Sequence, residues 1–343
     1  MPHPSDASMS GSNFSSPNNG TSNETETAEE EPVLLSSTLI VLLSFICVLI
    51  TITNGLVVYL TYKKETLRSL TNMFLTSLAL SDMLSALLGF PVFVVCLESA
   101  ILSTCVSSTI FFRFTAISSV CHVLLVACDR HIAVVHPLKY DSIVTKWRAV
   151  GATVFVWLFS FVVSVIQLTW YTLDEASLTD YEESEEFDVK YSKTCIVLFF
   201  VVPLLLMCYN YGHIFYISSK LAKTDRQLTN ALQQPTRPVL HEWRGRSVLL
   251  IMVVIFAGCW LPYFLAMLGD HMESSQLSHT PVWVERLLVV LRFTPPLLNP
   301  LLCTLVKKDF RQALEGVIRR KALQNYRKRV TYSHRSTSDT GNT

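Results

Sequence analysis

Seven long apolar segments dominate this sequence. Each has about 20 residues or more, the length a helix needs to cross the ~30 Å hydrocarbon core of a membrane. Half of the 343 residues are hydrophobic and 16% are charged, against about 25% charged in a typical soluble domain. The sequence therefore predicts an all-α membrane protein, a bundle of seven transmembrane helices. The predicted spans are Leu34–Tyr62, Thr71–Leu97, Cys105–Val135, Trp147–Tyr171, Cys195–Leu221, Ser247–Leu268 and Val282–Val306.

The segment before the first span, residues 1–33, is polar and rich in Ser, Asn, Thr and Glu. It contains too few bulky apolar residues to fold alone, so we expect it to be disordered. Three N-x-Ser/Thr sequons, at Asn13, Asn19 and Asn23, predict a glycosylated extracellular terminus.

The chain after the last span begins with the stretch KKDFRQALEGVIRRK, residues 307–321. Its apolar residues, Phe310 and Leu314 among them, recur at helical spacing between basic ones. This pattern predicts a short amphipathic eighth helix on the membrane surface. Residues 322–343 are polar and rich in Ser and Thr, and are expected to form a disordered cytoplasmic tail.

Basic and acidic residues fall on opposite sides of the predicted membrane. Of the 28 Lys and Arg residues, 22 lie at one side. Eight Asp and Glu residues gather between Asp174 and Asp188 on the other side. Because basic loops stay in the cytoplasm, the N-terminus is predicted outside and the C-terminus in the cytoplasm. The acidic run is either a solvated loop or a surface that attracts a cationic ligand.

An Asp-Arg pair, Asp129 and Arg130, lies near the end of the third apolar segment. Ionisable residues at membrane depth are costly and are usually functional, so this pair is a candidate switch. The nine cysteines form no CxxC pair and no Cys/His cluster with metal-ligand spacing. No metal site is therefore predicted.

Short motifs follow one another in order along the seven predicted spans. They are Thr53-Asn54-Gly55-Leu56-Val57, Leu78-Ala79-Leu80-Ser81-Asp82, Asp129-Arg130-His131, Trp157, Pro203 with Tyr211, Phe256 with Cys259-Trp260-Leu261-Pro262-Tyr263, and Asn299-Pro300. In this order they resemble the motifs of rhodopsin-like (class A) G-protein-coupled receptors. The resemblance implies a seven-transmembrane receptor domain over residues 34–306, multi-pass in the plasma membrane, that is not an enzyme.

The resemblance also implies how such a receptor works. It transmits an extracellular signal, or constitutive activity, to heterotrimeric G proteins when helix six opens around Arg130. In the resting state Arg130 should pair with Asp129 and with Glu242. Arrestin, receptor kinases, an unknown extracellular ligand and the lipid bilayer are expected partners, and nucleic acid is not. The other residues assigned to the switch and to G-protein coupling are His131, Tyr211, Asn299 and Pro300.

Two residues of the switch region depart from the family pattern. His131 stands where tyrosine is common, either as a tolerated variant or as a proton-sensitive helix end. Cys303 replaces the tyrosine of the family's Asn-Pro-x-x-Tyr motif. Tyr211 is therefore expected to lack its usual water-bridged partner, which would alter the active state or the basal activity.

Proline kinks a helix because it removes a backbone hydrogen bond. Trp260 lies close to Pro262 in the sixth span, where an event in a pocket would move the kink. By the resemblance, an activation relay is formed by Val120, Pro203, Phe256, Trp260 and Pro262. The alternative for the two aromatic residues is ordinary core packing.

Asp82 is a lone carboxylate deep in the second span, where it needs polar partners. The resemblance offers Asn54, Ser119 and Asn299, together with an allosteric sodium ion as the one candidate cofactor. However, Pro295-Pro296 stands where family members commonly supply Asn and Ser ligands. Proline has no side-chain oxygen to offer a cation.

Residues near the predicted extracellular ends of the spans indicate the kind of ligand. Phe112 stands where amine receptors carry an aspartate, and Phe293 where visual pigments carry the retinal lysine. The chain therefore resembles an orphan member of the family and neither an amine receptor nor an opsin. Arg113 and Arg292 predict an anion-binding pocket, unless they pair internally with Glu98 or Glu285. The predicted pocket residues are Phe112, Arg113, Trp260, Tyr263, Val289, Arg292 and Phe293.

By the resemblance, Cys105 stands at the family's disulfide position at the head of the third span. Cys195 is the candidate partner in the second outside loop, and Cys105–Cys195 is the expected pair. The alternative is Cys96–Cys105, because connectivity does not follow from sequence.

Other classes of membrane protein explain the sequence less well. A transporter or channel should show internal repeats and broken helices, and no repeated half is evident. An intramembrane enzyme would need a catalytic constellation, and none is evident. A seven-helix receptor that does not signal is the remaining alternative, motivated by His131, Cys303 and Pro295-Pro296.

Overall fold

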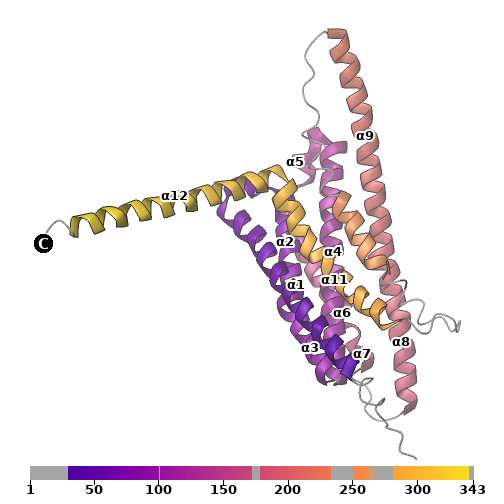
Figure 1. Ribbon diagram of the computed structural model, residues 1–343. Helices are drawn as coiled ribbons and strands as arrows, with labels where there is room; N and C mark the ends of the chain where they lie inside the picture. Colours follow the sequence, from indigo (N-terminus) through magenta and orange to yellow (C-terminus); the bar gives the residue numbers. More distant parts are fainter. Residues whose placement is uncertain are drawn as a thin grey trace, which may run out of the picture. The chain divides into compact units, whose positions relative to one another are not determined.

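The computed structural model describes residues 30–99, 101–171, 178–232, 250–262, 265 and 281–339. The chain divides into two compact units, Met1–Val41 and Leu42–Thr343. The described part of the first unit is the start of helix α1 (Glu30–Lys63). In the second unit the described residues form helices joined by short turns (Figure 1).

The helices after α1 follow the apolar segments of the sequence. They are η1 (Glu65–Leu67), α2 (Leu70–Leu84), η2 (Ser85–Gly89), α3 (Phe90–Ser99), α4 (Leu102–Val135), η3 (Pro137–Lys139), α5 (Tyr140–Ile143), α6 (Lys146–Val165), α7 (Leu168–Tyr171), α8 (Leu178–Ile196), η4 (Val197–Val201), α9 (Val202–Leu232), α11 (Val282–Val306) and α12 (Lys308–Asp339). A further helix, Leu250–Pro262, lies between α9 and α11 in the chain.

The predicted all-α class is confirmed over the described residues. Five helical stretches are long and apolar enough to cross a membrane, namely Ser37–Lys63, Leu70–Ser99, Leu102–Val135, Lys146–Val165 and Phe187–Thr224. The sixth predicted span appears as the shorter apolar helix Leu250–Pro262. The seventh is α11, which begins and ends at the predicted residues.

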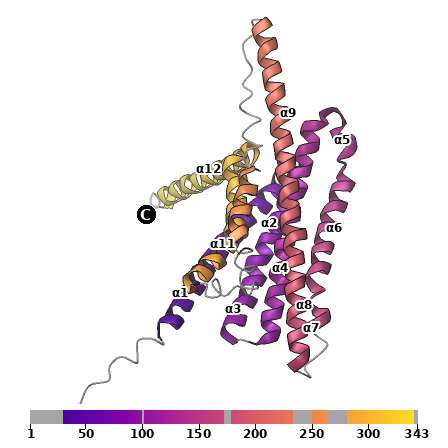
Figure 2. The same ribbon diagram turned by 90° about the vertical axis from the view of Figure 1, so that its right-hand side faces the viewer.

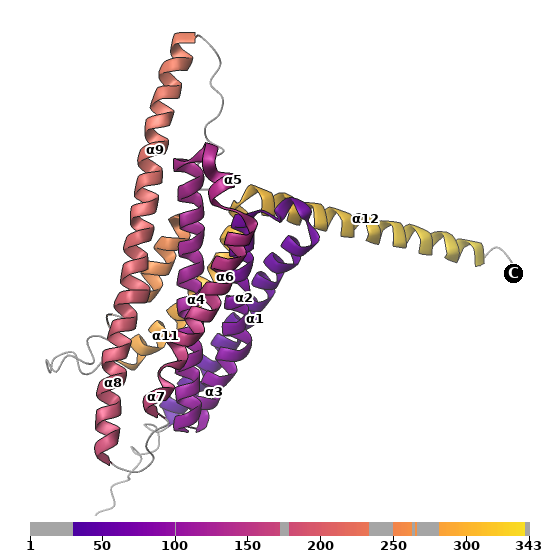
Figure 3. The same ribbon diagram turned by 180° about the vertical axis from the view of Figure 1, so that it is seen from behind.

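Helix α4 is the centre of the packing. It contacts α2, α3, α6 and α9, and Figure 2 and Figure 3 show α9 and α6 beside it in views from different sides. Its buried Val123, Val126 and Ala127 join one apolar cluster with residues of α2, α9 and the helix Leu250–Pro262. The side chains that carry chemistry on α4 are therefore held by neighbours on several sides.

Two wide helical turns precede prolines. The π-helix η2 ends at Gly89, two residues before Pro91, and the π-helix η4 ends at Val201, two residues before Pro203. A proline ring clashes with the carbonyl four residues earlier and leaves it without its N–H donor. The wider π turn relieves this clash, so the sequence can continue as a helix through each proline.

Helix α11 stays helical although it contains Pro295, Pro296 and Pro300. Pro300 has no N–H to offer the carbonyl of Pro296. The buried Asn54 amide donates to that carbonyl at 2.9 Å and to the carbonyl of Ile50 at 3.0 Å. Asn54 thus compensates the backbone bond that Pro300 removes, which ties α1 to α11.

A buried polar network links α2, α4 and α6. The indole N–H of Trp157 donates to Ser77 at 2.9 Å, and the Ser77 hydroxyl lies 2.8 Å from Nε2 of His122. Nδ1 of His122 donates to the carbonyl of Ser118 at 2.7 Å, so Nε2 accepts from Ser77. Each polar group of this network has a hydrogen-bond partner, as burial in an apolar bundle requires.

Replacing Ser77 with alanine is expected to destabilise the fold by about 1–3 kcal/mol, since it leaves the Trp157 N–H and His122 Nε2 buried without their partner. Thermal unfolding of purified protein in detergent measures the effect. Ser81→Ala is the matched control, because Ser81 is also buried on α2 and, within the described part of the chain, its hydroxyl has no hydrogen-bond partner. Equal stability of the two variants would contradict the role of the network.

The predicted disulfide Cys105–Cys195 is wrong. The bond joins Cys96 of α3 to Cys105 of α4, with Cα atoms 4.8 Å apart, and Cys195 is a free, buried thiol. The expected outside loop is helical from Leu178, so Cys195 lies on a helix that continues into α9. The short turn between α3 and α4 brings Cys96 and Cys105 within the distance a disulfide needs.

The extents of three helices, α1, α8 and α12, also differ from the prediction. Helix α1 begins at Glu30, within the segment expected to be disordered. Much of the acidic run is part of α8 and not a loop. Helix α12 continues to Asp339, so residues 322–339 of the predicted disordered tail are helical. No Gly or Pro follows Gly316 before Asp339, and Lys, Arg, Ala, Leu and Gln favour a helix there.

The start of α12 packs on the bundle as an amphipathic helix should. Phe310 and Ala313 are buried against Val57, Leu60 and Leu67, near the turn between α1 and α2. Lys307 donates to the side chain of Asn72 on α2. The apolar face predicted for this segment therefore packs on the neighbouring helices.

Candidate functional site: a cavity and a charged switch

The Asp-Arg pair on α4 forms a compact charged network. Asp129 is buried, 3% exposed. Its Oδ2 accepts from Arg130 Nε at 2.9 Å and Nη2 at 2.6 Å, and from the Thr71 hydroxyl at 2.6 Å. Arg130 Nη2 also donates to the Thr71 oxygen. Thr71 on α2 therefore holds both members of the pair in place.

Tyr140 closes the other side of this network. Its hydroxyl donates to Asp129 Oδ1 at 2.7 Å from α5, the short helix that follows α4. Burial and the bond to Asp129 raise the pKa of Tyr140 to about 12, so the hydroxyl keeps its proton and donates at neutral pH. Thr71 and Tyr140 were missed by sequence reasoning, since they lie on other helices than Asp129 and belong to common residue types.

Of the other predicted switch residues, His131 follows Arg130 directly in the chain, whereas Asn299 bonds to Asp82 on α2. His131 Nε2 lies 2.9 Å from His213 Nδ1 on α9, a partner that the sequence did not suggest. The Tyr211 hydroxyl is buried and, among the described residues, has no hydrogen-bond partner. Glu242 lies outside the described residues.

Asp82 meets two of its three predicted partners. Ser119 donates to Oδ1 at 3.2 Å and the Asn299 amide to Oδ2 at 3.3 Å. Asn54 instead bonds to backbone carbonyls of α1 and α11. Pro295 and Pro296 line the small cavity beside Asp82.

A sodium ion beside Asp82 stays a prediction. A hard cation needs several oxygen ligands. Besides Asp82, the hydroxyl-bearing residues Ser85, Thr115 and Ser119 line this cavity. Asn299 turns its N–H toward the carboxylate, and the prolines offer no side-chain oxygen.

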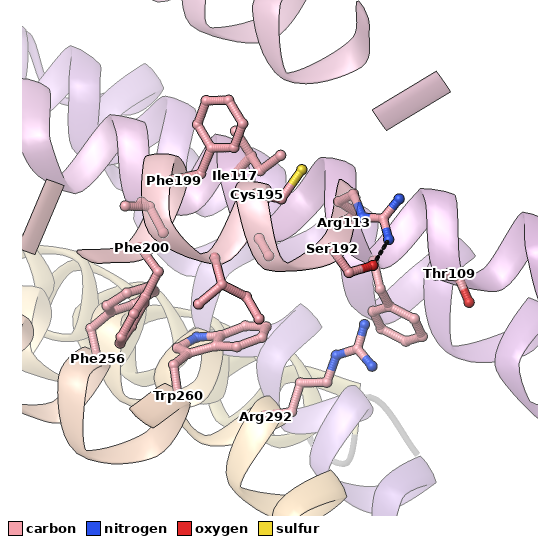
Figure 4. Close-up of a pocket in the computed structure, with 14 residues that line it drawn as sticks. Thr109, Arg113, Ile117, Ser192, Cys195, Phe199, Phe200, Phe256, Trp260 and Arg292 are labelled. Atoms are coloured by element: carbon pink, nitrogen blue, oxygen red, sulfur yellow. Dashed lines mark hydrogen bonds between the residues drawn. The ribbon is translucent and has the colours of Figure 1, made fainter. Parts of the chain in front are cut away.

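A cavity of about 110 Å³ lies between α4, the α8–η4 helix, the helix Leu250–Pro262 and α11. Of the predicted pocket residues, it is lined by Phe112, Arg113, Trp260 and Arg292. Figure 4 shows the two arginines near Ser192 and Thr109, and Phe200, Phe256 and Trp260 farther along the cavity. The residues that sequence reasoning missed are Thr109, Ala116, Ile117, Ser192, Cys195, Ile196, Phe199 and Phe200.

The remaining predicted pocket residues fall elsewhere. Phe293 is buried and packs edge-on against Phe112, with ring centroids 5.8 Å apart. Val289 lies on α11 but does not line the cavity among the described residues. Tyr263 lies outside the described residues, as do the three sequons. The missed residues of the α8–η4 wall lie in an apolar run whose inward face the sequence alone does not reveal.

Three of the five predicted relay residues cluster at the inner end of the cavity, and Pro203 and Pro262 are not part of that cluster. Val120, Phe256 and Trp260 pack together with Phe200 of η4. The rings of Phe256 and Trp260 lie 6.0 Å apart, and those of Phe200 and Phe256 5.8 Å apart. Phe200 of η4, three residues before Pro203, is the member of this cluster that sequence reasoning missed.

The comparison with known proteins agrees with this arrangement. The family described as "7 transmembrane receptor (rhodopsin family)" matches residues 53–302, so the chain belongs to the rhodopsin family of seven-transmembrane receptors. It is similar to the adenosine receptor A2a of Canis lupus familiaris, with 28% identity over 81% of this chain and 71% of that receptor. It is also similar to the histamine H2 receptor of Homo sapiens, with 28% identity over 78% of this chain and 75% of that receptor.

Membership in this family settles the class of function. The chain is a G-protein-coupled receptor of the membrane, with a seven-helix bundle, and not an enzyme. An extracellular ligand and a heterotrimeric G protein are its partners. The transporter or channel that remained as an alternative has no support.

Proposed function

We propose that this receptor binds its ligand in the cavity beside Trp260. It passes the signal to a G protein when helix six, the helix that contains Leu250–Pro262, moves away from Arg130 and opens the bundle there. In this proposal the N-terminus is extracellular and the C-terminus cytoplasmic, as the distribution of basic residues favours. Arrestin and receptor kinases act on the cytoplasmic side.

One observation carries this proposal. The helix Leu250–Pro262 contributes Phe256 and Trp260 to the cavity wall and Met252 and Val253 to the apolar cluster that contains Tyr211. A ligand that shifts Trp260 therefore moves a helix whose other end packs near the Arg130 end of α4. Tightly packed elements of this kind switch between discrete arrangements instead of deforming smoothly.

In the resting state we propose that Glu242 pairs with Arg130 across the base of helix six. Replacing Glu242 with alanine removes this charge pair and is expected to raise ligand-independent signalling several-fold. Basal cyclic AMP and calcium, measured in cells at equal surface expression, test the proposal, with Arg130→Ala as the uncoupled control. Basal signalling that is unchanged or lower in Glu242→Ala would refute the lock.

A further inference from the structure

The cavity has two chemically different ends. Phe200, Phe256 and Trp260 form an aromatic inner end. At the other end Figure 4 shows Arg113 and Arg292 near the hydroxyl groups of Ser192 and Thr109. A small ligand that fits both ends must have an apolar body and a polar head.

Arg113 is held by neutral groups in the described part of the chain. Its Nη1 donates to Gln167 Oε1 at 2.6 Å, its Nη2 donates to Ser192 at 3.0 Å, and its guanidinium carbon lies 4.8 Å from the centre of the Tyr191 ring. Gln167 in turn donates to the carboxylate of Asp188 at 2.7 Å, so an amide separates Arg113 from that acid. These contacts orient the guanidinium of Arg113 at the wall of the cavity.

Arg292 is oriented by aromatic rings. Its guanidinium carbon lies 3.8 Å from the centre of the Phe112 ring and 6.0 Å from that of Trp260. A guanidinium stacked on a ring is stabilised by the ring face and directs its N–H groups along its own plane. Helices α4 and α11 thus each present a planar cation to the same cavity.

We propose that the cavity binds a small amphiphilic organic anion. A carboxylate or sulfate head lies between Arg113 and Arg292, and an aromatic or aliphatic body extends toward Phe256 and Trp260. Arginine suits this role because its planar fork matches carboxylate geometry. Two cations lining one cavity repel a cationic ligand. The inference rests on the proposed function, since it names the class of ligand for the same cavity.

The free thiol of Cys195 supplies a test that needs no known ligand. Cys195 lines the cavity close to Arg113. Purified full-length receptor is treated with a negatively charged methanethiosulfonate (sulfonatoethyl) or a positively charged one (trimethylammonioethyl). Labelling of the Cys195 peptide is followed by mass spectrometry, with Cys195→Ser as the blank. Each rate is divided by the rate of the same reagent with a small free thiol.

The normalised rate of the anionic reagent is expected to exceed that of the cationic reagent about tenfold, because two nearby cations attract one and repel the other. Arg113→Gln and Arg292→Gln should each lower this ratio several-fold, and Arg113→Lys and Arg292→Lys should retain most of it. Arg148→Gln is the matched control, because Arg148 is an exposed arginine that bonds to carbonyls of Ser142 and Ile143. It should leave the ratio unchanged.

A second arm uses two probes that share a ring system and differ in charge. Indole-3-acetate should slow the labelling of Cys195, and tryptamine should not. A normalised ratio at or below one, a ratio unaffected by both Gln variants, or protection by tryptamine alone would overturn the anion site. Failure of both reagents to label Cys195 would overturn it too, since the cavity would then be closed to ligands. These readouts do not depend on signalling, so they fail or succeed separately from the proposed function.

Discussion

Replacing Asp129 with asparagine is expected to raise ligand-independent signalling by roughly 30-fold. The substitution keeps the size of the side chain but removes the charge that holds Arg130 through two N–H groups. A hydrogen bond to a charged group contributes about 1.5–3 kcal/mol. A loss of about 2 kcal/mol from the resting state alone shifts its equilibrium with the open state roughly 30-fold. Basal cyclic AMP and calcium at matched surface expression measure the change.

Variants of the same network should give graded results. Tyr140→Phe removes one neutral donor to Asp129, so its basal signal should rise less than that of Asp129→Asn. Adding Arg130→Ala to Asp129→Asn should return the signal to that of untransfected cells, because Arg130 is the proposed contact for the G protein. A basal signal in Asp129→Asn equal to the wild-type signal would show that the pair does not restrain the receptor.

Loss of the disulfide is the second large effect. Cys105→Ser is expected to destabilise the receptor by about 2–3 kcal/mol, because the unfolded chain regains the conformational entropy that a closed loop of this length removes. The bond joins residues nine positions apart. Cys96→Ser should have the same effect, and the double variant should be no worse than either single one. Thermal unfolding and surface expression provide the measurements.

Cys195→Ser is the matched variant for this prediction. Cys195 is buried and free, so its replacement should cost much less than that of Cys96 or Cys105. Non-reducing peptide mapping identifies the pair independently. A Cys105–Cys195 peptide, or equal destabilisation by Cys195→Ser and Cys105→Ser, would contradict the structure.

The helices could be predicted from the sequence because their cause is local. In a membrane, the backbone N–H and C=O groups of a long apolar segment must form their hydrogen bonds within the segment, as they do in a helix. Helix α11 begins and ends at the predicted residues. The extent of α8 and α12 could not be predicted in the same way. In polar segments a helix and a solvated coil differ little in free energy, since no burial decides between them.

The candidate site was predictable where an unusual residue marks it. Arg113 and Arg292 are conspicuous because charge is costly in an apolar span, and the structure places both at one cavity. Thr71, Tyr140 and Phe200 are ordinary residues whose roles depend on neighbours on other helices. The role of Asn54 at the carbonyl of Pro296 likewise follows only from the packing of α1 against α11.

The most direct test of the central claim is a distance measurement across the Arg130 end of the bundle. Spin labels at Ser142→Cys and Leu250→Cys, in protein lacking the exposed Cys208, report the separation of the helix Leu250–Pro262 from α5 by pulsed electron paramagnetic resonance. We predict a mainly short distance in the receptor with native Asp129, and a second, longer population when Asp129→Asn is added. Identical distance distributions in the two proteins would contradict the claim that Asp129 and Arg130 hold the receptor closed.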